Sequence, residues 1–202
     1  VIRTTFLPYG LQIKGGKFFS DFGRINAIHA HAWDFVDQPL IYNLAFGDHG
    51  LNEKGVQLSW LAPAPFYLLT GVEALQGDNE KLFSHIGEDP LPEEEGPRAY
   101  VGWMKFSPVL PDAHGLQIGF FGATGVHQEA HGTPEAGHEA DEEHVHEDEE
   151  EHAHDAHVPA HYLDGRSYFY GADFVYKYDS YKSYGQGDWT VQGEYFHRKK
   201  DL

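Results

Sequence analysis

Apolar and polar residues alternate one by one over several stretches of this chain, as they do in β-strands that have one apolar and one polar face. In SYFYGADFVYKY the side chains that share one face are Tyr168, Tyr170, Ala172, Phe174, Tyr176 and Tyr178. The stretches DWTVQGEYF, GLQIGFFGA and GVQLSWL repeat the alternation, and AYVGWMKFS and FYLLTGVEALQ show it less clearly. Helical periodicity is nearly absent, so the pattern predicts an all-β protein of about eight strands, with a partial first strand within residues 1–6.

The connections between these stretches alternate in length. LPYG, APAP, SPVLPDAH and DSYKSYGQG are short, whereas residues 20–54, 77–97 and 126–165 form long connections. One end of the sheet should therefore carry tight turns and the other end extended loops. This layout is typical of an antiparallel transmembrane β-barrel, or a segment of a larger one, with short periplasmic turns and long extracellular loops. We expect residues 1–202 to form one such domain.

A soluble β-sandwich is the alternative fold, since it also has many short strands. It would not place so many Tyr and Phe side chains on an outer face. No run approaches the roughly 20 apolar residues of a membrane helix. The first residues, VIRTTFLPYG, lack the pattern of a signal peptide, as expected for a mature or truncated chain.

Three motifs carry a resemblance to a known family. GGKFFSDFG (Gly15–Gly23), GVQLSW and DWTVQGEYF resemble strands of the porin-type barrels of Gram-negative outer membranes, most closely the phosphate-selective porin group. The resemblance implies a channel for small solutes in the bacterial outer membrane. The chain departs from that group in having only 14 Lys and Arg residues, although passage of anions requires basic side chains. It also ends in FHRKKDL, without the usual terminal aromatic residue.

The charge is concentrated in one segment. The formal net charge is −18, and residues 128–161 hold twelve Asp and Glu without a basic residue, which leaves −6 for the remainder. This balance excludes binding to a nucleic-acid backbone, which needs clustered Lys and Arg, and it favours cations. Because the chain has no cysteine, any metal must be held by imidazole and carboxylate groups.

A low-complexity segment rich in His and acidic residues, 127–161, is expected to be an extracellular loop. Its candidate ligands for zinc or another loosely bound divalent cation are His127, His131, His138, His144, His146, His152, His154, His157 and His161. The segment resembles the His-rich loops of zinc-acquiring outer-membrane receptors. A solvated acidic segment without metal and a single defined site are the alternatives.

His29 and His31 are further candidate metal ligands, in the first long connection. A His-x-His pair also begins the metal site of some hydrolases, so a soluble metal-dependent hydrolase is one alternative function. The helices of that enzyme fold are missing, however. Simple packing within a folded loop explains the pair equally well. No catalytic constellation stands out, and we expect no enzyme.

The polar side of the strands supplies candidate pore-lining residues: Gln57, Ser59, Lys105, Gln117, Asp173, Lys177, Gln192 and Glu194. We therefore expect an outer-membrane channel or receptor for small-solute uptake, which gathers zinc or a similar metal ion through its loops. Its partners would be outer-membrane lipid, small solutes and metal ions, but no nucleic acid. The sequence leaves a homo-oligomer open, as well as a metal-binding module without a pore.

Overall fold

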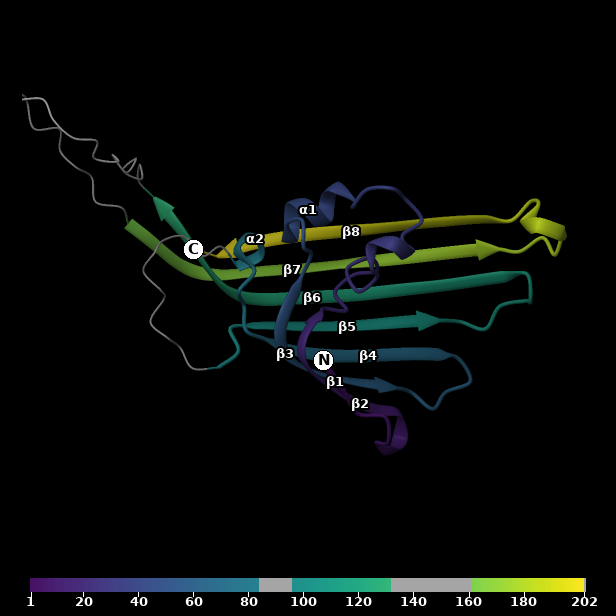
Figure 1. Cartoon of the computed structure of the whole chain (residues 1–202), viewed down its shortest axis with the longest axis horizontal. Helices are drawn as coiled ribbons and strands as arrows, with labels where there is room; N and C mark the ends of the chain where they lie inside the picture. Colours follow the sequence, from purple (N-terminus) through teal and green to yellow (C-terminus); the bar gives the residue numbers. More distant parts are fainter. Residues whose placement is uncertain (84–95, 132–160, 202) are drawn as a thin grey trace, which may run out of the picture.

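The described part of the chain forms one antiparallel sheet of eight strands whose order in space follows the sequence (Figure 1). The computed structural model describes residues 1–83, 96–131 and 161–201. The strands are β1 (Ile2–Arg3), β2 (Leu11–Phe19), β3 (Asn52–Leu61), β4 (Tyr67–Leu75), β5 (Ala99–Ser107), β6 (His114–His131), β7 (His161–Tyr178) and β8 (Trp189–Asp201). The prediction of an all-β, antiparallel chain is confirmed.

One face of the sheet, called the outer face, is apolar and exposed. The cross-strand partners Leu58 and Val72, or Tyr176 and Val191, show that each predicted apolar set lies on this face. Its exposed members are Leu11, Ile13, Val56, Leu58, Trp60, Val72, Tyr100, Met104, Phe120, Tyr168, Tyr170, Phe174, Trp189, Val191 and Tyr195. Among the described residues no second sheet covers them, which is not the arrangement of a β-sandwich.

The opposite, inner face of the sheet is covered by the connection between β2 and β3, residues 20–51, here called the inner loop (Figure 1). The loop contains α1 (Leu40–Phe46), and α2 (Glu80–Phe83) lies beside it. Side chains of the loop and of the inner face together form the hydrophobic core. This packing explains why the alternation of apolar and polar residues is less clear in FYLLTGVEALQ and AYVGWMKFS. Leu75 on β4 and Val101 and Trp103 on β5 are apolar and buried because the loop and helices pack on the inner face.

The sheet is not closed into a barrel. In the described part of the chain β1 pairs with β2 and β8 pairs with β7, and the two terminal strands do not meet. An eight-stranded barrel has an interior just wide enough for side chains. Here the inner face carries a whole loop with a helix, so these eight strands are too few to close around it.

Two further expectations are corrected. The strand pattern missed α1 because this helix has only seven residues and is apolar on both sides, so it shows no helical stripe. The strands β6 and β7 extend into the segment expected to be a loop, where His131 and His161 are cross-strand partners. Backbone pairing continues past the alternating stretch because it does not depend on side-chain polarity. Three short 3-10 turns complete the described elements: Pro8–Gly10, Ala30–Ala32 and Ser183–Gly185.

None of the helices in the described ranges is long and apolar enough to cross a membrane.

Candidate functional site

The predicted pore-lining residues all lie on the inner face. The registers pair Gln57 with Glu73, Asp173 with Glu194, and Lys177 with Thr190 on this face. Six of the predicted residues interact with the inner loop and, with Lys14 and Glu73, form what we call the polar belt: Lys14, Gln57, Glu73, Lys105, Gln117, Asp173, Gln192 and Glu194. Ser59 and Lys177 share the inner face, but no interaction with the loop is seen for them among the described residues.

Asp21 of the inner loop contacts residues of the polar belt on four strands. Its carboxylate lies 3.3 Å from the Lys14 Nζ on β2 and 3.4 Å from the Lys105 Nζ on β5, and it accepts a hydrogen bond from Gln57 Nε2 at 2.6 Å. The Asp21 backbone N–H donates to Glu73 Oε1 at 3.0 Å. Side chains from β2, β3 and β5 thus converge on one carboxylate, as they do on the inner side of a curved sheet.

Arg24 makes the second attachment of the loop, on β6 and β8. Its backbone N–H donates to Glu194 Oε1 at 2.6 Å. The guanidinium donates to Gln192 Oε1 at 3.2 Å and to Gln117 Oε1 at 3.4 Å. Both acceptors are neutral amides, so they fix the position of the cation without cancelling its charge. Asp173 is the carboxylate that interacts electrostatically with both Arg24 and Lys105.

Between the two attachments the loop carries Phe22 into the core. Phe22 is fully buried, and its ring lies 4.5 Å from the ring of Phe121 and 5.6 Å from that of Phe196. Phe46 and Phe169 complete the aromatic cluster. The space between the loop and strands β6 to β8 is therefore filled by side chains at this level. Gly119 allows the Asp173 carboxylate to lie against β6, since a Cβ at this position would collide with it.

The charged and hydrogen-bonding groups around Asp21 and Tyr42 favour the packing of the inner loop on the inner face of the sheet. Burial raises the pKa of the Asp21 carboxyl, but the charges of Lys105 and Lys14 and the Gln57 hydrogen bond outweigh it, so the pKa lies below its usual range. Asp21 is therefore ionised at neutral pH. Burial, together with the Glu194 carboxylate beside it, raises the pKa of the Tyr42 hydroxyl, which stays protonated. The Tyr42 oxygen accepts a hydrogen bond from the Ile25 backbone N–H at 3.1 Å.

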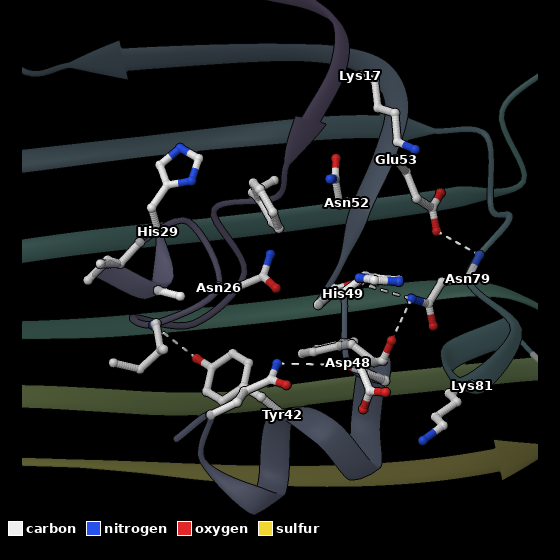
Figure 2. A pocket seen from close by; sticks show the side chains of 18 of the residues that line it. Lys17, Asn26, His29, Tyr42, Asp48, His49, Asn52, Glu53, Asn79 and Lys81 are labelled. Atoms are coloured by element: carbon white, nitrogen blue, oxygen red, sulfur yellow. Dashed lines mark hydrogen bonds between the residues drawn. The ribbon is translucent and has the colours of Figure 1, made fainter. Parts of the chain in front are cut away.

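A cavity of about 890 Å³ opens between the inner loop, the ends of β2 and β3, and α2 (Figure 2). Glu53 points toward Asn79 and accepts hydrogen bonds from the backbone N–H groups of Gly77 and Asn79. Lys17 and Lys54 are exposed cross-strand partners at the rim. The cavity therefore has cationic and anionic groups on its wall, and its polar side chains mainly hold the loops in place.

His29 and His31 lie in the inner loop, as expected, and their rings stack with centroids 5.7 Å apart. Both are exposed, and Asp34 is exposed nearby. Across residues 1–83, 96–131 and 161–201, no group of three His, Asp or Glu side chains that could hold a metal ion is found. His127 and His131 belong to β6 and His161 to β7, while His138, His144, His146, His152, His154 and His157 lie outside the described residues.

The sequence pattern identified the inner-face residues but missed their partners in the loop. Asp21 and Arg24 fall in a segment without strand periodicity, and Lys14 and Glu73 lie on the polar sides of strands whose alternation was interrupted or blurred. Only the charges in SDFGR, directly after a strand, could have pointed to this loop.

The comparisons with known proteins place the chain beside one relative. An uncharacterized protein of Aquifex aeolicus (strain VF5) is 40% identical over 205 residues, which cover 98% of this chain and 38% of the relative. The chain thus spans well under half the length of the relative it matches. No family model and no solved structure matches the chain.

Proposed function

We propose that the chain forms part of the wall of an outer-membrane channel for small solutes. The observation that carries the proposal is the contrast between the two faces of the sheet. The outer face exposes apolar side chains across β2 to β8, and the inner face holds charged and amide groups. In a channel the outer face contacts lipid, and the inner face lines an aqueous passage.

The distribution of aromatic side chains on the outer face supports this orientation in lipid. Tyr176 and Trp189 are in ring contact, with centroids 5.0 Å apart, near the short turns. Tyr168 and Tyr170 lie farther along the outer face of β7, toward the long loops, and Phe120 on β6 lies opposite Ala172 between the two pairs. Exposed aromatic side chains on the apolar face are typical of strands that cross a bilayer.

The inner loop would narrow the passage. It is attached to β4 through Glu73 and to β8 through Glu194, and the aromatic core fills the space behind it. Further strands would complete the wall, since the inner loop needs more room than eight strands enclose. The relative is long enough to supply such strands, because the matched region is only 38% of it.

Insertion into lipid tests the membrane part of this proposal. The purified protein is mixed with phosphatidylcholine vesicles, and flotation and planar-bilayer conductance are measured. Val72→Arg places a cation on the outer face and should weaken insertion by about 2–4 kcal/mol. Gln12→Arg places the same group on the inner face and should insert like the unaltered protein. Loss of insertion in both variants, or in neither, would contradict the assignment of the two faces.

The metal part of the proposal rests on the histidines and acidic residues of 127–161. Neutral imidazoles would exchange zinc rapidly near pH 7, and protonation below about pH 6 would release it. We expect calorimetric zinc binding at pH 7.5 that is largely lost when residues 132–160 are replaced by a Gly/Ser linker, while conductance is kept. No zinc binding by the unaltered protein would remove this part alone.

A further inference from the structure

The cavity beside the inner loop has the size and the wall of a small-molecule site. Its volume of about 890 Å³ falls within the range of about 300–1,000 Å³ that is usual for sites of small organic ligands. Part of its wall is apolar or aromatic and consists of Phe19, Ile25, Ile28 and Trp33. The Phe19 ring meets the His29 ring edge-on, with centroids 5.6 Å apart. The cavity therefore offers a surface on which a flat ring can lie.

The carboxylates on this wall already interact with donors of the protein itself. Glu53 accepts hydrogen bonds from two backbone N–H groups between β4 and α2. Asp78 forms an ion pair with Arg98 at 3.1 Å, and Asp48 accepts a hydrogen bond from the Asn43 amide. These acidic groups hold the connections around the cavity, so they are not the groups that would select a ligand.

Two cations on the same wall lack such partners. Lys17 on β2 and Lys54 on β3 are direct cross-strand partners, and both are exposed. In the part of the chain that the structure describes, neither side chain has an ion pair or a hydrogen bond. Two like charges placed directly opposite each other on a sheet repel. An anion between the two amines would remove this repulsion.

The neighbouring cross-strand pair brings an aromatic ring to the same place. Phe19 and Asn52 are partners two residues farther along, so they share one side of the ladder with the two lysines. This group follows Val56, past the apolar part of the outer face, where the contact of Phe19 with His29 shows that the inner loop bends over the strand ends. Figure 2 shows Lys17, Asn52 and His29 around the cavity.

We propose that this cavity binds a small organic anion in which a carboxylate is attached to one or two flat rings. The carboxylate would lie between Lys17 and Lys54 and accept charge-assisted hydrogen bonds from both. The ring would lie against Phe19 and Trp33. The cavity lies where β2 and β3 meet the inner loop, at the end of the sheet that carries the long connections. In the proposed channel it would collect this solute at the mouth, but binding itself does not require conduction.

Equilibrium dialysis with radiolabelled benzoate tests the site. The protein is kept in a neutral detergent, and the same detergent without protein gives the blank. We expect saturable binding of one benzoate per chain. Acetate, which lacks the ring, and benzyl alcohol, which lacks the charge, should each compete at least about tenfold more weakly than benzoate. These comparisons use the unaltered protein and do not depend on the folding of any variant.

Two variants assign the binding to the lysine pair. Lys17→Gln and Lys54→Gln should each weaken benzoate binding by about tenfold, because one charge-assisted hydrogen bond is lost. Lys182→Gln is the matched control, since it removes the same charge at an exposed position in the short turn between β7 and β8, at the other end of the sheet. The control should bind benzoate like the unaltered protein.

Four outcomes would overturn the inference. The first is the absence of saturable benzoate binding by the unaltered protein. The second is competition by acetate, inorganic phosphate or benzyl alcohol that equals that of benzoate, since the ring wall or the lysines would then contribute nothing. The third is unchanged binding in folded Lys17→Gln and Lys54→Gln, or an equal loss in Lys182→Gln. The fourth is displacement of benzoate by phosphatidylglycerol but not by phosphatidylcholine, which would make a lipid head group the occupant.

The same measurement separates this inference from the proposed function. Benzoate binding by a protein that fails to conduct would contradict the proposed channel and leave the inference standing.

Discussion

At the scale of single residues, Asp21 is the group that attaches the inner loop to the wall. One carboxylate pairs with Lys14 and Lys105, so neither lysine on these strands is left unpaired beneath the loop. A partly buried charge of either sign is costly without its partner. Asp21 and the two lysines therefore depend on one another, and the loop is held by charge as well as by its apolar core.

Asp21→Asn should loosen the loop. The variant keeps the backbone hydrogen bond to Glu73 but loses the charge, so we expect docking to weaken by about 2 kcal/mol. The pKa of Asp21 is lowered when the inner loop packs on the sheet. Its contribution to the stability of the packed loop is therefore fully present above the ordinary pKa of 3.8 and is lost as the pH falls through the lowered pKa. Hydrogen exchange of the loop amides, corrected for intrinsic rates, gives a protection factor for each amide. We expect these protection factors to be lower in the variant than in the unaltered protein by a constant ratio from pH 5 to pH 8. A difference that disappears within this range would contradict the ionised Asp21.

Arg24 is expected to affect ion selectivity. Its guanidinium is held by Gln117 and Gln192, which do not neutralise it. Arg24→Ala removes a fixed cation beside Asp173, so bilayer reversal potentials in a salt gradient should shift toward cation selectivity. Arg24→Lys keeps the charge and should keep most of the selectivity. Equal reversal potentials in all three proteins would place Arg24 away from the passage.

At the scale of elements, the inner loop explains which strands alternate cleanly. On β7 the residues Phe169 and Val175 are buried on the inner face, yet the Tyr residues of the outer face keep the pattern visible. On β4 and β5 both faces are apolar in places, because the inner face there forms the floor of the core. A blurred pattern thus marks the part of a strand that the loop covers.

The core contribution of the loop can be measured at Phe22. Phe22→Ala removes a fully buried ring from the aromatic cluster and should destabilise the protein by about 3–5 kcal/mol. Phe120→Ala is the matched control, since this ring is 51% exposed on the outer face. Unfolding by urea in detergent should show a much smaller decrease in the free energy of unfolding for Phe120→Ala than for Phe22→Ala. Equal effects would mean that the two rings are equally buried in the folded protein.

At the scale of the whole molecule, the apolar outer face decides how the protein behaves in water. An exposed patch that runs over seven strands is far larger than soluble monomers usually carry. We expect the protein to aggregate in plain buffer and to become monodisperse in detergent, as measured by size-exclusion chromatography. A monodisperse protein in plain buffer would favour the soluble alternatives, including a hydrolase that uses His29 and His31.

The sequence alone determined the faces of the strands and the alternation of short and long connections. These features are local, because the side-chain direction along a strand repeats every two residues and turn length is set by neighbouring segments. Tyr168 and Asp173 could therefore be assigned to opposite faces before any coordinates were known.

Only the tertiary structure decided that the first long loop folds back onto the inner face and that eight strands stay open. The contact of Arg24 with Glu194 joins residues 170 positions apart, and nothing in either local pattern specifies the other. Closure likewise depends on the summed curvature of all the strands and on the space that the loop occupies between them, and both are properties of the assembled sheet.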